Sequence, residues 1–235
     1  MAETRLDEIA DGIFRLNTAV PTPAGSFSFN QYLIADDEPL LFHTGPKRLF
    51  ESVRAAIARV LLPEKLRWIA FSHYESDECG SANLLFGLAP HASPVCSQVC
   101  ALINGDTFDR APHTLADGKS LAIGRHRLTW FDTPHLPHGW ECGYMMEEST
   151  RTLLCGDLFT QPGSGDVALT TSDDILATSE AMRGVLDYFS HTRKARAMIE
   201  RLAATRPTTL ACMHGSAYQG DGAALLRRLG DVFDA

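Results

Sequence analysis

At three separate places in this chain, a residue that can bind a metal lies at or just beyond the end of a short, mostly apolar segment. This repeated arrangement is the sequence feature that most constrains the fold. The segments are residues 67–71, which Ser72 separates from His73, residues 153–156, followed by Asp157, and residues 210–213, followed by His214. Short apolar runs between turn residues are typical of buried strands, and a buried carboxylate without a partner is costly. Because α/β proteins place their ligands where strands end, we predict a shared site at one edge of a sheet.

The pattern of the whole chain predicts strands in two groups, each followed by helices. Strands are predicted at residues 12–17, 29–35, 40–44, 67–71, 95–96, 126–132, 142–147, 152–155 and 208–213. Helices are predicted at residues 47–62, around residues 84–86, at residues 98–103 and within residues 172–204. No sharp repeat and no linker divides the chain, so we expect one domain, residues 1–235, with the α/β architecture of an αββα sandwich.

Charge and composition argue against several classes of partner. The 235 residues are 45% hydrophobic, and 29 acidic against 21 basic side chains give a net charge of −8. We therefore expect neither nucleic acid nor an anionic membrane as a partner. Residues 1–11 lack the features of a secretory signal, and no apolar stretch has the length of a membrane span, which predicts a cytoplasmic protein. The six cysteines are expected to be reduced, and most of them to be buried like small hydrophobic residues.

Residues 72–77 place three potential metal ligands at alternate positions. In an extended turn after a strand, the side chains of His73, Glu75 and Asp77 can project from one side, which suits metal ligation. Such a segment alone is more often a solvated turn. Its weight comes from polar residues at or beyond the ends of other predicted strands. Together they give six candidate ligands: His73, Glu75, Asp77, His138, Asp157 and His214.

This ordered set resembles the metallo-β-lactamase superfamily over nearly the whole chain. Most hydrolases of that superfamily carry H-x-H-x-D-H, which binds two zinc ions, whereas this chain has Glu75 in place of the second His and Glu78 in place of the last. A carboxylate in place of an imidazole shifts the preference from zinc toward iron or manganese. The H-x-E-x-D variant resembles the diiron domain of flavodiiron oxygen and nitric oxide reductases, and the stand-alone oxygen-binding diiron proteins. We expect no room for a flavodoxin domain in 235 residues.

The resemblance implies two non-haem iron ions, with zinc or manganese as the alternative. It assigns one iron to His73, Glu75 and His138, the other to Asp77 and His214, and a bridging position to Asp157. The implied protein binds or reduces O₂ or NO, either with an external electron donor or as an oxygen sensor with a signalling partner. The alternative is a dinuclear hydrolase that acts on a thioester, lactone or phosphoester. The sequence leaves a homo-oligomer open.

One of the six ligand positions has a competitor. His135 competes with His138, because residues 133–135 partly resemble the Thr-Pro-Gly-His loop of the superfamily hydrolases. The interval from His138 to Asp157 resembles that of the flavodiiron group. We therefore expect His138 to be the ligand, and His135 to be a hydrogen-bonding or loop residue.

Other polar and aromatic residues have open or structural roles. Tyr74 and Trp140 either line the oxygen pocket or pack in the core. Glu78 either accepts a proton or is a helix N-terminal carboxylate, and the helix favours the second role. His43 stands where superfamily members usually have Asp, so we expect a structural role for its imidazole. The remaining histidines are expected at the surface: His91, His113, His126 and His191.

Overall fold

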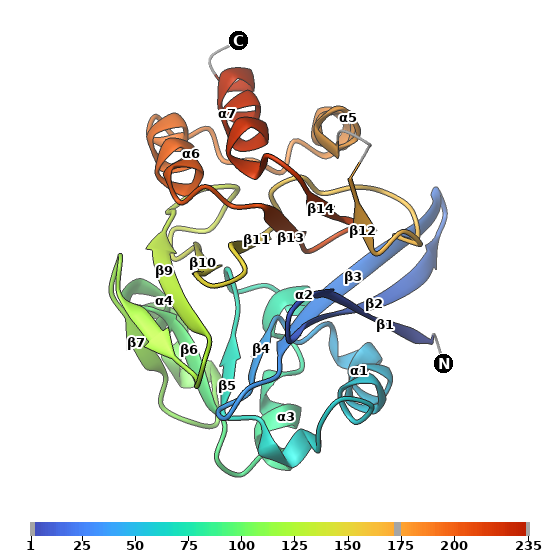
Figure 1. Ribbon diagram of the computed structural model, residues 1–235, viewed down its shortest axis with the longest axis vertical. Coiled ribbons are helices and arrows are strands. Elements are labelled where there is room, and N and C mark those ends of the chain that lie inside the picture. The colour runs from blue at the N-terminus through green and yellow to red at the C-terminus, as the bar shows by residue number, and fades with distance from the viewer. Residues whose placement is uncertain (1–2, 172–174, 234–235) are drawn as a thin grey trace.

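The computed structural model describes residues 3–171 and 175–233 of the chain. Within these residues the strands form two seven-stranded sheets, packed between two outer layers of helices (Figure 1). The α/β class and the αββα sandwich predicted from the sequence are therefore confirmed. The helices of the described residues are all too short or too polar to span a lipid bilayer.

The first sheet joins an antiparallel meander to a set of parallel strands. Its order is β1 (Thr4–Ala10), β2 (Ile13–Thr22), β3 (Gly25–Ile34), β4 (Leu40–Phe42), β5 (Trp68–Ala70), β6 (Ser93–Ser97) and β7 (His113–Leu115). Pairing is antiparallel from β1 to β4 and parallel from β4 to β7. The segments between β4 and β7 contain α1 (Phe50–Ile57), α2 (Ser76–Cys79), α3 (Ala82–Leu88), α4 (Gln98–Asn104) and the 3-10 helices Lys47–Leu49, Pro63–Lys65 and Gly105–Thr107. Since parallel strands need such crossovers, β5 ends at an edge of the sheet and the chain turns there into α2.

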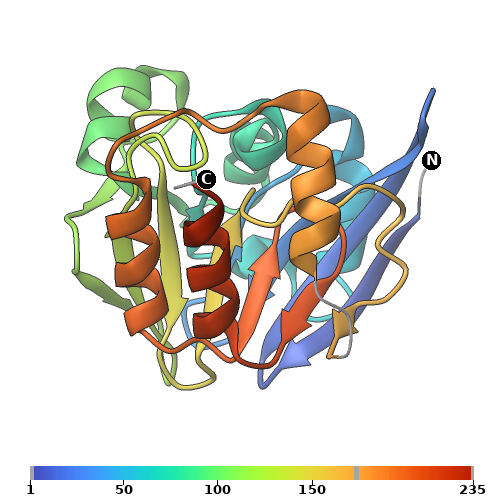
Figure 2. The same ribbon diagram turned by 90° about the horizontal axis from the view of Figure 1, so that it is seen from above.

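The second sheet brings two further strand ends next to each other. Its order is β12 (Leu169–Thr170), β14 (Ala217–Gln219), β13 (Thr209–Cys212), β11 (Thr152–Gly156), β10 (Gly143–Glu147), β9 (Arg127–Asp132) and β8 (Ser120–Ala122). Helices α5 (Ile175–Leu186), α6 (Ala195–Ala204) and α7 (Gly222–Val232) lie across its outer face (Figure 2). Strands β11 and β13 are parallel, with Gly156 opposite Cys212. The residues that follow them therefore leave the sheet side by side.

Apolar side chains fill the space between all four layers. Phe42, Trp130 and Leu154 are fully buried between the two sheets. Leu85 of α3 belongs to the core beneath the first sheet, and Leu226 of α7 to the core above the second. Because both faces of the sheets are covered, the strand ends are where polar side chains can gather.

Several elements differ from those predicted from the sequence. The predicted helix at residues 47–62 is shorter in the structure, because α1 ends at Ile57. Pro63 begins a separate 3-10 helix beyond it. Strands β1, β7, β8, β12 and β14 and helix α7 were not predicted, since most of the strands are too short for apolar periodicity to show. In the predicted helical stretch 172–204, residues 172–174 lie outside the described residues, and residues 187–194 separate α5 from α6.

Candidate metal centre

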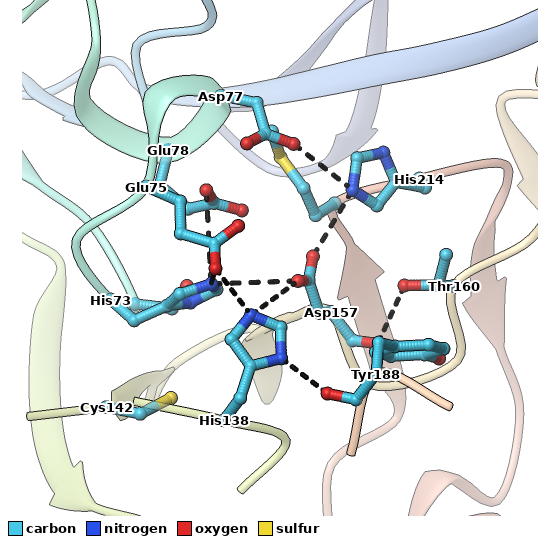
Figure 3. Close-up of polar contacts among 12 residues, drawn as sticks. His73, Glu75, Asp77, Glu78, His138, Cys142, Asp157, Thr160, Tyr188 and His214 are labelled. Carbon is cyan, nitrogen blue, oxygen red and sulfur yellow. Dashed lines mark hydrogen bonds and ion pairs between the residues drawn. The ribbon is translucent and has the colours of Figure 1, made fainter. Parts of the chain in front are cut away.

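The six residues predicted as ligands lie close together where the strands of both sheets end (Figure 3). His73 follows β5, and Glu75 and Asp77 lie at the beginning of α2. Asp157 follows β11 and His214 follows β13, whereas His138 comes from the loop between β9 and β10. A hydrogen bond from the backbone N–H of Gly143 to the carbonyl of Ser72, 2.8 Å long, connects the two sheets at this point.

Asp157 occupies the centre of the cluster. Its Oδ2 lies 3.7 Å from Nε2 of His73 and 3.7 Å from Nε2 of His138. Its Oδ1 lies 3.3 Å from Nε2 of His214. One carboxylate thus faces two separate groups of imidazoles, which is the arrangement that a bridge between two metal ions requires.

Each group of imidazoles also faces a carboxylate from the segment after β5. Oε1 of Glu75 lies 3.1 Å from Nε2 of His138 and 3.9 Å from Nε2 of His73. Oδ2 of Asp77 lies 3.6 Å from Nε2 of His214. The cluster therefore divides into two halves that share Asp157, and each half offers nitrogen and oxygen donors.

Hydrogen bonds hold the three imidazoles with Nε2 directed into the cluster. Nδ1 of His138 lies 2.8 Å from the carbonyl oxygen of Tyr188, and Nδ1 of His214 lies 2.8 Å from that of Ser28. A carbonyl oxygen only accepts, so both Nδ1 atoms carry the proton and donate it. Nδ1 of His73 lies 2.9 Å from the hydroxyl of Ser72. Such contacts fix ring orientation and leave Nε2 free for a metal.

Unsatisfied buried atoms show that the cluster fits cations. Nε2 of His73 and both carboxylate oxygens of Glu78 are buried and have no hydrogen-bond partner among the residues that the structure describes. A buried polar group without a partner is costly, and a metal ion would satisfy all three atoms. Oε2 of Glu78 lies 4.0 Å from Nε2 of His73, so Glu78 adds a further oxygen donor to the cluster.

The protonation equilibria of the cluster reflect its excess of carboxylates. Burial raises the pKa of Asp157, but the hydrogen bond and charge of His214, with the charges of His73 and His138, lower it below its usual range. Burial lowers the pKa of His138, yet its hydrogen bond to Glu75 and the charge of Asp157 raise it to about 9. Burial raises the pKa of Glu78 well above its usual value, and the charge of Asp157 adds to this effect. A cation bound here would take over the role that protons play in the metal-free protein.

The residues with open roles take distinct positions. His135 is exposed and does not belong to the clustered ligand atoms, so the structure brings His138 and not His135 to the cluster. Tyr74 is 38% exposed and Trp140 is 57% exposed, so core packing does not apply to either. Tyr74 lines a cavity of about 280 Å³ beside Glu75, together with Cys79, Phe108 and others.

Sequence reasoning underestimated Glu78. Glu78 lies in the first turn of α2, as expected, but its carboxylate is also completely buried and points into the cluster, which we did not predict. The signal was its position in the motif, where the related hydrolases carry their last histidine. The carbonyls of Ser28 and Tyr188 were also missed, because a backbone acceptor leaves no trace in side-chain type.

The predictions for the other histidines and the cysteines can also be compared with the structure. All six cysteines are buried, as expected for most of them. His91, His113 and His191 are exposed, as predicted. The prediction for His126 was wrong, because it is 1% exposed and its Nδ1 lies 3.0 Å from Oε1 of the buried Glu147. The acid on the neighbouring strand supplies the partner that allows this histidine to be buried.

The sandwich fold and the carboxylate–histidine cluster at its strand ends define the class: a metallo-β-lactamase-like protein with a candidate metal centre. Within this class the chain belongs to the ODP family, because the family described as "ODP family beta lactamase" matches residues 27–215.

Known relatives of the chain are longer proteins of the flavodiiron type. It is 30% identical over 146 residues to a nitric oxide reductase of Moorella thermoacetica, covering 57% of this chain and 34% of the relative. It is 24% identical over 211 residues to the rubredoxin-oxygen oxidoreductase of Megalodesulfovibrio gigas, covering 85% of this chain and 51% of the relative. The crystal structure of the flavodiiron protein from Giardia intestinalis shares the fold, with a TM-score of 0.79, 19% identity and coverage of 97% of this chain and 59% of that one. The chain thus spans about a third to three fifths of these relatives.

Proposed function

We propose that the chain is a non-haem diiron protein that binds or reduces dioxygen or nitric oxide. The observation that carries this proposal is the position of Asp157 between two halves of a cluster in which carboxylates outnumber imidazoles. Oxygen-rich sites with few imidazoles and no cysteine ligand favour iron or manganese over zinc. The names of the relatives, a nitric oxide reductase and a rubredoxin-oxygen oxidoreductase, support the same chemistry.

The residues of the two halves would hold one iron each. His73, Glu75 and His138 would bind the first, Asp77 and His214 the second, and Asp157 both. The buried oxygens of Glu78 are placed to join either half. When bound, a pair of ferrous ions supplies electrons and open coordination positions to a diatomic ligand.

The protein's own residues would control access and orientation. Glu75 is 50% exposed, whereas His73, Glu78 and Asp157 are buried, so the cluster opens to solvent on the side of Glu75. The cavity beside Glu75 is lined partly by aromatic residues, Tyr74 and Phe108, and exceeds the volume of a diatomic gas. We propose that this cavity is where the gas first gathers, with Tyr74 as part of its wall and Trp140 on the loop that bears His138.

The source of electrons lies outside the residues described. We propose that reduction of the gas needs an electron donor separate from this metal centre. Without a donor, the same site binds oxygen and passes the signal to a protein partner. The two roles differ in whether O₂ is consumed over many turnovers when a reductant is supplied.

Metal analysis and optical spectra test the proposal together. The purified protein is loaded with ferrous iron without oxygen, its metal content is measured, and spectra are recorded before and after exposure to air. We expect two irons per chain and a new charge-transfer band after exposure. Protein from unsupplemented cells that contains only zinc, stays colourless and cleaves esters, thioesters or lactones would instead establish the dinuclear hydrolase.

A further inference from the structure

His43 connects the strand ends that carry His73 and His214. It is 1% exposed, and its backbone adopts φ 66°, a left-handed conformation that a non-glycine residue rarely takes. Nε2 of His43 lies 3.0 Å from the hydroxyl oxygen of Ser72, and Nδ1 lies 3.0 Å from the sulfur of Met213. Ser72 precedes His73 in the chain and Met213 precedes His214. On each side, His43 thus contacts the residue that immediately precedes a candidate ligand.

The direction of the hydrogen bonds around His43 follows from one backbone donor. The N–H of Ser72 points at Nε2 of His43 over 3.3 Å, and a backbone N–H can only donate. Nε2 is therefore an acceptor, and the proton of the neutral ring sits on Nδ1, directed at Met213. Burial keeps the ring neutral, since it lowers the pKa of His43 to about 3.

This direction removes an ambiguity at His73. The Nδ1 atoms of His138 and His214 face carbonyl oxygens, which accept only, but Nδ1 of His73 faces a hydroxyl, which can donate or accept. Ser72 has one hydroxyl proton. If it is donated to Nε2 of His43, the hydroxyl oxygen must accept from Nδ1 of His73.

We propose that His43 is a positioning residue which, through Ser72, holds His73 in the tautomer with the proton on Nδ1 and the lone pair of Nε2 directed into the metal centre. The inference rests on the proposed role of His73 as a metal ligand. Without His43, the hydroxyl of Ser72 would be free to turn its proton toward Nδ1 of His73. The ring proton would then move to Nε2, where the carboxylates of Glu75, Glu78 and Asp157 lie within 4.0 Å to receive it.

Nitrogen NMR of the metal-free protein tests the tautomer directly, using His43→Leu, Ser72→Ala and the double variant. In the wild type we expect His73 to carry its proton on Nδ1. In His43→Leu we expect a mixture with the Nε2–H form. His43→Gln should restore the wild-type tautomer, because the amide oxygen of glutamine can accept from Ser72.

Metal affinity, measured by competition with a chelator, gives a second readout. Loss of such a supporting contact typically weakens metal binding about 10- to 100-fold, and we expect this for His43→Leu and Ser72→Ala. The double variant should be no weaker than Ser72→Ala, because both changes break the same chain of hydrogen bonds. Additive losses would overturn the proposal.

His126→Leu is the matched control for a general loss of stability. His126 is equally buried, at 1% exposure, but precedes β9 at the end of the second sheet away from the cluster. We expect it to lower the melting temperature and leave the tautomer of His73 unchanged. If His43→Leu keeps the Nδ1–H form, the proposal fails. The NMR readout needs no iron, so a protein that binds zinc would refute the proposed function and leave this result intact.

Discussion

Oδ1 of Asp157 lies 3.3 Å from Nε2 of His214 because the parallel pairing of β11 and β13 sets their two strand ends side by side. The same carboxylate reaches His73 with its other oxygen, across the interface between the two sheets. The order and packing of the strands therefore bring Asp157, His214 and His73 together at the centre of the site. The carboxylate that joins its two halves is the residue whose loss should separate them.

The first prediction is that Asp157→Asn reduces bound iron from two ions per chain to one or none. An amide keeps the shape of the side chain but has no charge and only one oxygen donor, so it cannot bridge two cations. Metal analysis after anaerobic loading and desalting checks this. Asp187→Asn is the control, since Asp187 is exposed and its ion pair at 3.5 Å is with the exposed His191. Two retained irons in Asp157→Asn would refute a bridging role.

The second prediction concerns metal selectivity and changes Glu75. We expect Glu75→His to shift competitive loading from iron toward zinc by at least about tenfold, because imidazole suits zinc better than a carboxylate does relative to iron. The measurement is the iron-to-zinc ratio in protein equilibrated with both metals. Glu64→His, at an exposed position of a 3-10 helix, is the control for an added histidine. An unchanged ratio would show that Glu75 does not set the metal preference.

Much of the centre could be predicted because its residues follow segments with strong local patterns. The apolar runs before His73, Asp157 and His214 identify strand ends, and parallel strands of one sheet end at a common edge. Periodicity could not show that the loop bearing His138 folds back onto the cluster. The prediction of His138 depended on the number of residues between it and Asp157, which resembles that of the flavodiiron group.

Features that depend on tertiary contacts escaped prediction. Glu78 lies in the first turn of α2, and the sequence alone does not show that its carboxylate is fully buried. His126 was expected at the surface, because the sequence does not show that Glu147 on the neighbouring strand is its partner. Edge strands such as β12, with the two residues Leu169–Thr170, carry no periodicity at all.

The third prediction concerns the buried pair of His126 and Glu147 and gives a pH dependence of the free energy of unfolding. Hydrogen bonds from Ser149, Thr150 and His126 outweigh burial and lower the pKa of Glu147 to about 2. A carboxylate with a lowered pKa stabilises the fold above its unfolded pKa of about 4.3, and this stabilisation disappears as the pH falls toward about 2. We expect Glu147→Gln to lower the free energy of unfolding at pH 7 by on the order of 2 kcal/mol.

Denaturant unfolding across pH 2 to 7 checks the sign. The difference between wild type and Glu147→Gln should shrink below a pH of about 4 and vanish near about 2. Glu148→Gln serves as the control, because Glu148 is exposed and its ion pair with Arg127, at 3.5 Å, involves two exposed side chains. A difference that stays constant over this range would show that the charge of Glu147 does not stabilise the fold.

The fourth prediction concerns Glu78 and separates a metal ligand from a structural residue. Both of its oxygens are buried without a hydrogen-bond partner in the described part of the chain, so at neutral pH this side chain should destabilise the metal-free protein. Glu78→Gln removes the acid and should raise the stability of the metal-free protein by roughly 1 kcal/mol, while it weakens metal binding.

Thermal unfolding with and without ferrous iron measures both effects on one sample. A ligand therefore gives changes of opposite sign in the two states, whereas a purely structural carboxylate would change both states in the same direction. Because Asp157 and Asp77 supply the charges nearest to Glu78, the gain in the metal-free protein should also shrink in an Asp157→Asn background.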